Sequence, residues 1–230
     1  MPKNQRVHFA DHRSRRVVYV SSCLLDQNRR YPGIAVGAGA LRDLFLPLAE
    51  NGIGVEQLPC LECLGWGGVS RTSSLRFMPT IFRYADSKLF PIVRGIVRIW
   101  LLRYRRLCKK VVKAIAIDMK NLVDNGYDIV GIIAMNDSPT CGVTKTIGII
   151  DFVAKSKSMG LKLEDLTSPS FDKMKEVLPS LLVTGRGLFM TELLFALRRQ
   201  AIVQRVFEFN PWNDIKTEAG RVVGEILQTR

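Results

Sequence analysis

Histidine and cysteine, the side chains that most often bind transition metals, are scarce in this sequence. Its 230 residues include two histidines and five cysteines. The cysteines are odd in number and widely scattered, which argues against a framework of disulfides. No apolar signal segment follows the basic, polar N-terminus, so we expect a reducing, cytoplasmic compartment. Cysteines in such a compartment serve as core residues, metal ligands or reactive groups.

Long apolar runs are also missing. The nearest candidate, 89–107, is interrupted by five arginines, whereas a transmembrane helix needs about 18 uninterrupted apolar residues. We therefore predict no transmembrane segment. Internal repeats and low-complexity blocks are absent, and 47% of the residues are hydrophobic, which is enough for a core without disulfides. We expect a flexible basic arm over 1–16 and a single α/β domain over 17–230.

Acidic residues are outnumbered: 34 Lys and Arg against 21 Asp and Glu give a net charge of +13. Such an excess attracts polyanions, and nucleic acid, an anionic membrane surface and an anionic small substrate all stay open. A long predicted helix carries basic residues on one face and apolar residues on another. Its candidate contacts with a nucleic acid such as tRNA are Arg94, Arg98, Arg105 and Lys109. A solvated basic face and a membrane-surface role are the alternatives.

Strand-like and helix-like segments alternate along the chain. Compact β-branched runs predict strands at 17–22, 53–58, 129–134, 147–152 and 201–209. Helical periodicity predicts helices at 41–50, 93–123, 188–200 and 212–228, with a helix or loop at 169–178. A glycine-rich loop and an irregular stretch are expected over 61–90. This alternation predicts an α/β fold with a Rossmann-like, mostly parallel sheet and flanking helices.

Three cysteines, Cys23, Cys60 and Cys141, each follow a predicted strand. Because ligands of open α/β sheets bind beyond the carboxyl ends of the strands, the fold would bring these thiols to one edge. Thiolates are the preferred ligands of iron–sulfur clusters, and three can bind four irons while leaving one iron open. We therefore predict a [4Fe–4S] cluster on these three cysteines. The alternative is three unrelated buried thiols.

Cys63 leaves the ligand set open. It forms a C-x-x-C with Cys60, a pattern found in redox sites and as half of a zinc site, although no second pair follows. A fourth thiolate would close the cluster and favour a structural role, whereas a free Cys63 would favour an enzyme. Cys108 lies on the apolar side of the long helix and is predicted to be a core residue.

Three short motifs resemble those of a known family. They read Ser21–Ser22–Cys23–Leu24–Leu25 with Arg30–Tyr31–Pro32–Gly33, then Pro59–Cys60–Leu61–Glu62 with Gly67, Gly68 and Arg71, then Ser138–Pro139–Thr140–Cys141–Gly142. In this order they resemble S-A-C-L-L-G with R-Y-D-G, C-P-E with G-G-L and P-R, and S-P-S-C-G of the TudS family, the 2-thiouracil desulfidase-like proteins. The chain departs from that pattern at Asp26, Pro32, Leu61 and Cys63.

The resemblance implies a Rossmann-like domain whose [4Fe–4S] cluster is bound by the three cysteines. It also implies the removal of sulfur from a thiolated uracil, a related small thiolated substrate or thiouridine in tRNA. We expect Glu62 to be the acid–base group, with Asp137 as the second choice, and Ser138 to orient substrate or water. These side chains would otherwise only shape their loops. A nucleic-acid-binding protein with a structural iron–sulfur or zinc site is the alternative function.

Overall fold

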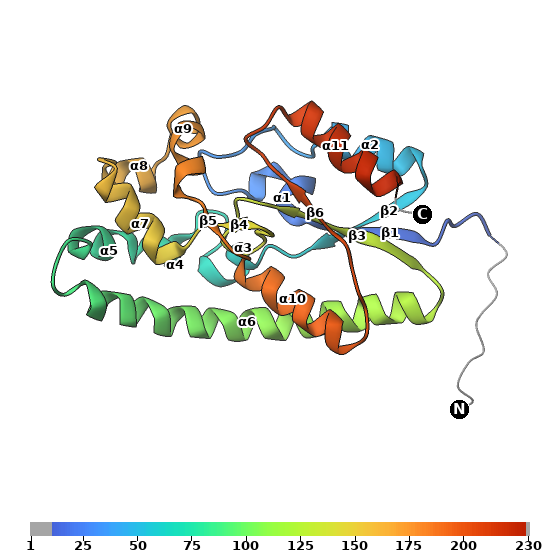
Figure 1. Cartoon of the computed structure of the whole chain (residues 1–230), viewed down its shortest axis with the longest axis horizontal. Coiled ribbons are helices and arrows are strands. Elements are labelled where there is room, and N and C mark those ends of the chain that lie inside the picture. Colours follow the sequence, from blue (N-terminus) through green and yellow to red (C-terminus); the bar gives the residue numbers. More distant parts are fainter. Residues whose placement is uncertain (1–10, 229–230) are drawn as a thin grey trace.

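A four-stranded parallel sheet forms the centre of the computed structural model, which describes residues 11–228. Its strands are β1 (Arg16–Ser21), β2 (Ile53–Leu58), β3 (Asp128–Met135) and β6 (Val206–Phe209), in the order β2-β1-β3-β6 (Figure 1). All three neighbouring pairs run parallel. The predicted α/β fold with a parallel sheet and flanking helices is therefore confirmed. Two short strands, β4 (Lys145–Thr146) and β5 (Val183–Thr184), form a separate antiparallel pair.

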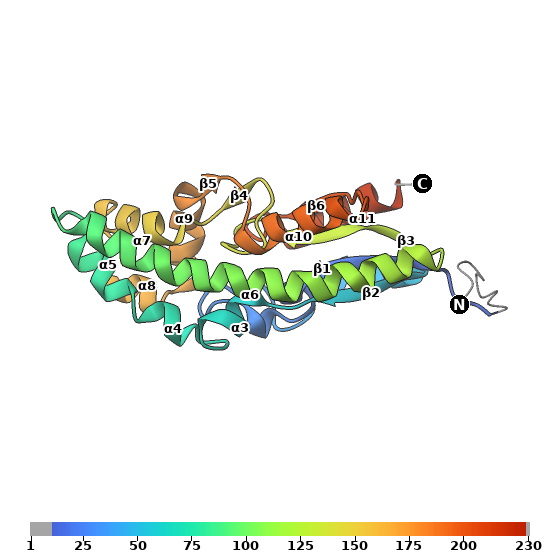
Figure 2. The same cartoon turned by 90° about the horizontal axis from the view of Figure 1, so that it is seen from below.

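Helices cover both faces of the sheet (Figures 1 and 2). One face carries α6 (Phe90–Asp124) and α10 (Leu188–Arg199), and the other carries α2 (Arg42–Glu50) and α11 (Ile215–Leu227). The alternation of side chains along a strand divides β1 between the two layers. Tyr19 packs in the core beneath α6, whereas Val18 and Val20 pack in the core beneath α2 and α11. Both faces of β1 are buried, as its unbroken apolar sequence predicts.

A further group of helices lies beyond the carboxyl ends of the strands, at the left of Figure 1. It comprises α5 (Met78–Tyr84), α7 (Ile149–Ser158), α8 (Leu163–Thr167) and α9 (Phe171–Leu181). Ile81, Val153 and Leu166 bury their side chains there against Val93 and Val97 of α6. The long helix α6 therefore belongs to two hydrophobic cores, one under the sheet and one among these accessory helices.

Two predicted strands are wrong in whole or in part. Three isoleucines within 147–152 predict a strand, but α7 begins at Ile149, and its Ile150 and Val153 pack together in the accessory core. The strand predicted at 201–209 is reduced to β6, whose four residues pair only with the end of β3. The stretch predicted as irregular contains α3 (Leu61–Trp66) and α4 (Thr72–Leu75) before α5.

The remaining short elements are α1 (Ser22–Leu25) and the 3-10 turn η1 (Gln27–Arg29), which follow β1 directly. Residues 1–10 of the predicted arm lie outside the described residues. Within 11–16, Arg13 donates a hydrogen bond of 3.1 Å to the Tyr127 hydroxyl, and Arg16 begins β1. No helix among residues 11–228 is long and apolar enough to cross a membrane.

Candidate functional site

Three cysteine side chains meet at the carboxyl edge of the sheet. Cys23 lies in α1 directly after β1, Cys60 is the N-cap of α3 after β2, and Cys141 lies in the loop after β3. The chain leaves β1 to form β2 on one side and β3 on the other, so this edge is the switch point where such sheets bind ligands. All three residues line one cavity of about 130 Å³. The structure thus brings together the three thiols that the sequence singles out.

Burial dominates the acid–base behaviour of these thiols. It raises the pKa of Cys23 well above 9.0, that of Cys60 to about 12, and that of Cys141 above 9.0. Arg30 partly opposes the rise in the pKa of Cys23, and the hydrogen bond from the Thr140 hydroxyl partly opposes the rise in the pKa of Cys141. The thiols are therefore neutral at neutral pH, and a metal that binds them as thiolates must displace their protons.

Arg71 is a buried cation beside two of the cysteines. Its guanidinium donates to the Cys63 sulfur at 3.1 Å, lies 3.6 Å from the Cys60 sulfur and forms an ion pair of 3.2 Å with Glu62. It also donates to the backbone oxygen of Arg29 at 2.8 Å. Cys63 therefore contacts Arg71 and is not among the residues that line the cavity. The same guanidinium thus lies against the sulfurs of both Cys60 and Cys63, and of these two residues only Cys60 lines the cavity.

Glu62 joins two of the three cysteine loops. One carboxylate oxygen accepts hydrogen bonds from the hydroxyls of Ser138 at 2.9 Å and Thr140 at 3.1 Å. The other accepts from Arg71. Ser138 in turn accepts hydrogen bonds from the backbone amides of Thr140 and Cys141. The predicted acid–base residue and the predicted orienting residue are thus in direct contact at the edge of the cavity.

The N-terminus of α10 supports the Cys141 loop from outside. The amides of Leu188 and Met190 donate to the backbone oxygens of Pro139 and Thr140. Gly187, the N-cap of α10, approaches so closely that a Cβ atom there would lie 2.3 Å from the Thr140 carbonyl. The sequence analysis missed this role, because the glycine lies 46 positions after the cysteine and no local motif marks it.

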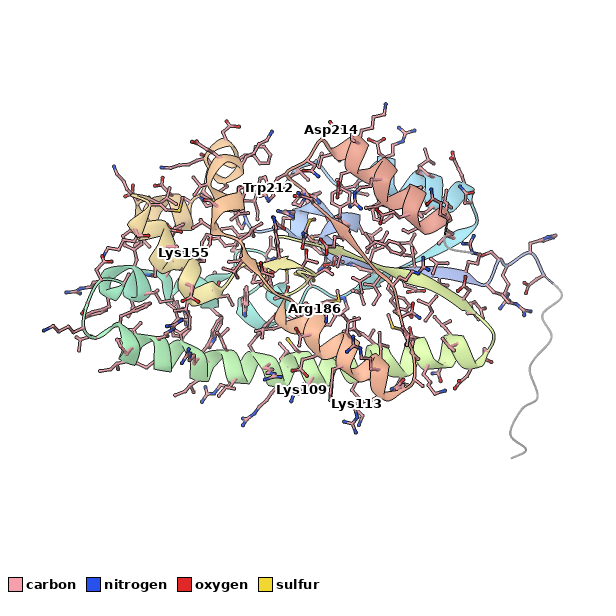
Figure 3. All side chains as sticks on the ribbon, viewed as in Figure 1. Lys109, Lys113, Lys155, Arg186, Trp212 and Asp214 are labelled. Atoms are coloured by element: carbon pink, nitrogen blue, oxygen red, sulfur yellow. The ribbon has the colours of Figure 1, made fainter. Side chains whose placement is uncertain are left out.

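A second buried ion pair closes another side of the cavity. Arg30 and Asp137 are joined at 2.9 Å, and their side chains are 3% and 4% exposed. The indole nitrogen of Trp212 donates to the same carboxylate oxygen at 3.0 Å. Figure 3 shows Trp212 in the loop before α11, near α9. Asp137, the second choice as an acid–base group, is therefore held by two donors, which suits an orienting role.

The far wall of the cavity is apolar. It is formed by the turn after η1 and by the accessory helices. The sequence analysis did not identify these residues, because they share no motif and meet only through tertiary packing. The apolar lining residues include Tyr31, Ile34, Met78, Phe152, Leu166 and Met174. The cavity is therefore polar near the thiols and apolar opposite them, as small-molecule sites commonly are.

The donor set fits an iron–sulfur cluster. The cavity presents three thiols, and no histidine lines it; thiolates are the common ligands of such clusters. Among residues 11–228, no three histidine, cysteine or carboxylate side chains are grouped closely enough to hold a single metal ion. A cluster places its irons at separate corners, so its thiolates stand farther apart than the ligands of one ion. Cys23, Cys60 and Cys141 are the residues that would hold it.

The predicted nucleic-acid contacts on α6 fall into two groups. Arg94 forms an ion pair of 2.9 Å with Asp151, and Arg105 forms one with Glu192. Arg98 and Lys109 are exposed.

Cys108 is completely buried in the core between α6 and the sheet, which confirms its predicted place.

The fold and cavity define an α/β protein with a cluster of thiols at the carboxyl edge of a parallel sheet. Comparison with known proteins adds one distant relative. The chain is 24% identical over 163 residues to the uncharacterized protein MJ0003 of Methanocaldococcus jannaschii. The aligned residues cover 70% of this chain and 90% of that protein. No family model matches the chain, and no solved structure matches it.

Proposed function

We propose that this protein is a cytoplasmic, [4Fe–4S]-dependent desulfidase. Its substrate would be a thiolated nucleobase, nucleoside or related small thio-compound, with thiouridine in tRNA as a larger candidate. The observation that carries the proposal is the convergence of Cys23, Cys60 and Cys141 on one cavity. The resemblance of the three cysteine motifs to those of TudS proteins supports the same reaction.

The proposed reaction exchanges sulfur for oxygen. A thiocarbonyl carbon takes up water, the C=S bond is replaced by C=O, and hydrogen sulfide leaves, so that no oxidant or reductant is consumed. When bound to three thiolates, the cluster supplies an open iron that acts as a Lewis acid toward the substrate sulfur. Because Cys63 does not line the cavity, we favour three ligands over four.

The chain's own residues would position water and move its proton. Both carboxylate oxygens of Glu62 accept hydrogen bonds at the edge of the cavity, so this group is placed to take a proton from water. Ser138 and Thr140 fix the orientation of that carboxylate. The Arg30–Asp137 pair and the apolar wall would shape the cavity around the body of the substrate and exclude bulk water.

Iron and acid-labile sulfide content, measured on protein purified without oxygen, tests the ligand set. We expect about four irons per chain. The variants Cys23→Ala, Cys60→Ala and Cys141→Ala should lose them, and the matched control Cys63→Ala should keep them. Loss of iron in the control as well would indicate a closed, structural cluster. A wild-type chain that binds no iron after reconstitution would overturn the proposal.

The reaction is tested with thiouracil, thiouridine and thiolated tRNA. Release of sulfide together with the oxygenated base is expected from iron-loaded protein only. If iron-loaded protein releases no sulfide from any of these compounds, the proposed substrate class is wrong. The proposed cluster would not be affected by that result.

A further inference from the structure

One face of α6 carries an unbroken stripe of exposed side chains. Its members are spaced alternately three and four residues apart, so they lie along one side of the helix. All of them are exposed. We call this set the outer stripe, and its members are Leu89, Ile92, Ile96, Ile99, Arg103, Arg106, Lys110, Lys113 and Ile117. Figure 2 shows α6 uncovered along the near side of the molecule.

The first half of the outer stripe is apolar. The side chains of Ile92, Ile96 and Ile99 are 62%, 55% and 60% exposed, and Leu102 beside them is 57% exposed. Large aliphatic side chains exposed singly are ordinary, but a row of them on one helix marks an interaction site. The opposite side of α6 already fills both hydrophobic cores, so this row contributes nothing to the packing of the chain.

The second half of the outer stripe is basic. Arg103, Arg106, Lys110 and Lys113 continue the same spacing. In the part of the chain that the structure describes, the acidic partners of α6 belong to Arg94, Arg105 and Lys120 instead. Figure 3 shows Lys109 and Lys113 at the outer edge of the molecule, below the ribbon of α6. These exposed charges are therefore available to an anionic partner outside the chain.

The combination favours an anionic lipid surface over other partners. Nucleic acid would pair with the basic half but would gain nothing from three exposed isoleucines. A second copy aligned in parallel would place like charges opposite each other, and an antiparallel copy would pair only the apolar row. That row is far smaller than the roughly 20 residues per side of a stable interface. An anionic bilayer accommodates both halves of the outer stripe. The aliphatic side chains can enter the boundary of the acyl region, and the cations can contact the headgroups.

We propose that α6 docks this protein, by its outer stripe, on the surface of an anionic bilayer. The straight helix, 35 residues long, would lie in the plane of the interface and not cross it. Long Arg and Lys side chains can reach the headgroups while their stems cover apolar surface. This inference is independent of the proposed desulfidase activity.

Co-sedimentation of the full chain with vesicles tests the docking. We compare phosphatidylcholine vesicles with vesicles that also contain phosphatidylglycerol. Binding is expected only to the anionic vesicles, and it should weaken as salt is added. The charge variant Arg103→Gln/Arg106→Gln should bind roughly 25-fold more weakly, because each of the two cations near the surface contributes about fivefold. The apolar variant Ile92→Ser/Ile99→Ser should lose at least about tenfold.

Val203→Ser is the matched control, since Val203 is the most exposed large apolar side chain of the described residues and is not part of the outer stripe. It should bind as wild type does. All variants change exposed positions, and their circular dichroism spectra should match that of the wild-type protein. The proposal fails if wild type ignores anionic vesicles, or if the apolar variant binds them unchanged. It also fails if the apolar variant only converts a dimer to a monomer, or if tRNA binds but vesicles do not.

Discussion

The Ser138 hydroxyl donates a hydrogen bond of 2.9 Å to Glu62, which lies 76 positions earlier in the chain. This contact ties the loop after β3 to the helix that follows β2, and each of those segments carries one of the cavity's cysteines. The carboxylate that we propose moves a proton therefore also sets the relative position of two predicted ligands. Its chemical and structural roles can be separated by substitution.

Glu62→Gln keeps the shape of the side chain, and its oxygen can still accept from Ser138 and Thr140, but it loses the ion pair with Arg71 and cannot take up a proton. We expect normal iron content and a loss of about a hundredfold or more in kcat for sulfide release. Glu56→Gln, at an exposed position on β2, is the control and should be fully active. A Glu62→Gln protein that turns over at the wild-type rate would assign the proton transfer to another group. Ser138→Ala should lower both iron content and activity, because it releases the Cys141 loop.

Gly187→Ala is expected to displace the Cys141 loop. The new methyl group would overlap the Thr140 carbonyl and approach the Cys141 amide to 2.8 Å. Overpacking of this kind costs about 1–3 kcal/mol, and the iron content should fall with it. Gly220→Ala provides the comparison, since a Cβ atom there meets nothing within 4 Å inside α11. That variant should be as stable as wild type or slightly more stable. Equal urea midpoints for the two variants would contradict the close contact.

The Arg30–Asp137 pair should show strong coupling between its two substitutions. Asp137→Leu leaves a buried guanidinium without its carboxylate, and we expect it to lower the free energy of unfolding by about 3–5 kcal/mol. The double variant Arg30→Met/Asp137→Leu removes both charges and should recover most of that loss. Urea denaturation of metal-free protein measures all four corners of the cycle. Additive losses would mean that the two side chains do not act as a pair.

Glu218 should make the fold sensitive to acid. Burial alone would raise the pKa of Glu218. Hydrogen bonds from Arg221 and from the Asn210 amide outweigh this effect, so the pKa is lowered from 4.5. The contribution of Glu218 to the free energy of unfolding is therefore fully present above pH 4.5. It is lost as the pH falls through the lower pKa of the folded state. Glu218→Gln should destabilise the protein at neutral pH by about 1–3 kcal/mol. The difference from wild type should narrow on acidification; the exposed control Glu176→Gln should show no such trend.

The sequence predicted the sheet well because its strands are local and strongly patterned. The strands predicted at 53–58 and 129–134 match β2 and β3 closely, and the long helix differs from α6 by a few residues at its ends. The strand predicted at 147–152 is wrong, because its isoleucines favour a strand by local preference while its actual neighbours are the accessory helices. Local preference decided the central elements, and tertiary packing decided this one.

The candidate site divides in the same way. Cys23, Cys60 and Cys141 could be found because strand ends are visible in a sequence and parallel strands bring their ends together. The contact of Glu62 with Ser138 follows from the same rule. Gly187, Trp212 and the apolar wall could not be found, because each belongs to a segment whose place depends on packing over the whole chain. Gly187 supports the Cys141 loop, Trp212 binds Asp137, and only the wall lines the cavity itself.

The length of α6 has a consequence for how this chain can vary. Val97 packs among the accessory helices, and Tyr104 packs under the sheet, within a single uninterrupted helix. One residue inserted between them would rotate one half against the other by about 100°. The wall of the cavity would then turn away from the thiols while both halves stayed helical. We therefore expect insertions and deletions to be tolerated at the two ends of α6 but not between Val97 and Tyr104, because the rotation between these two residues fixes the cavity wall relative to the thiols.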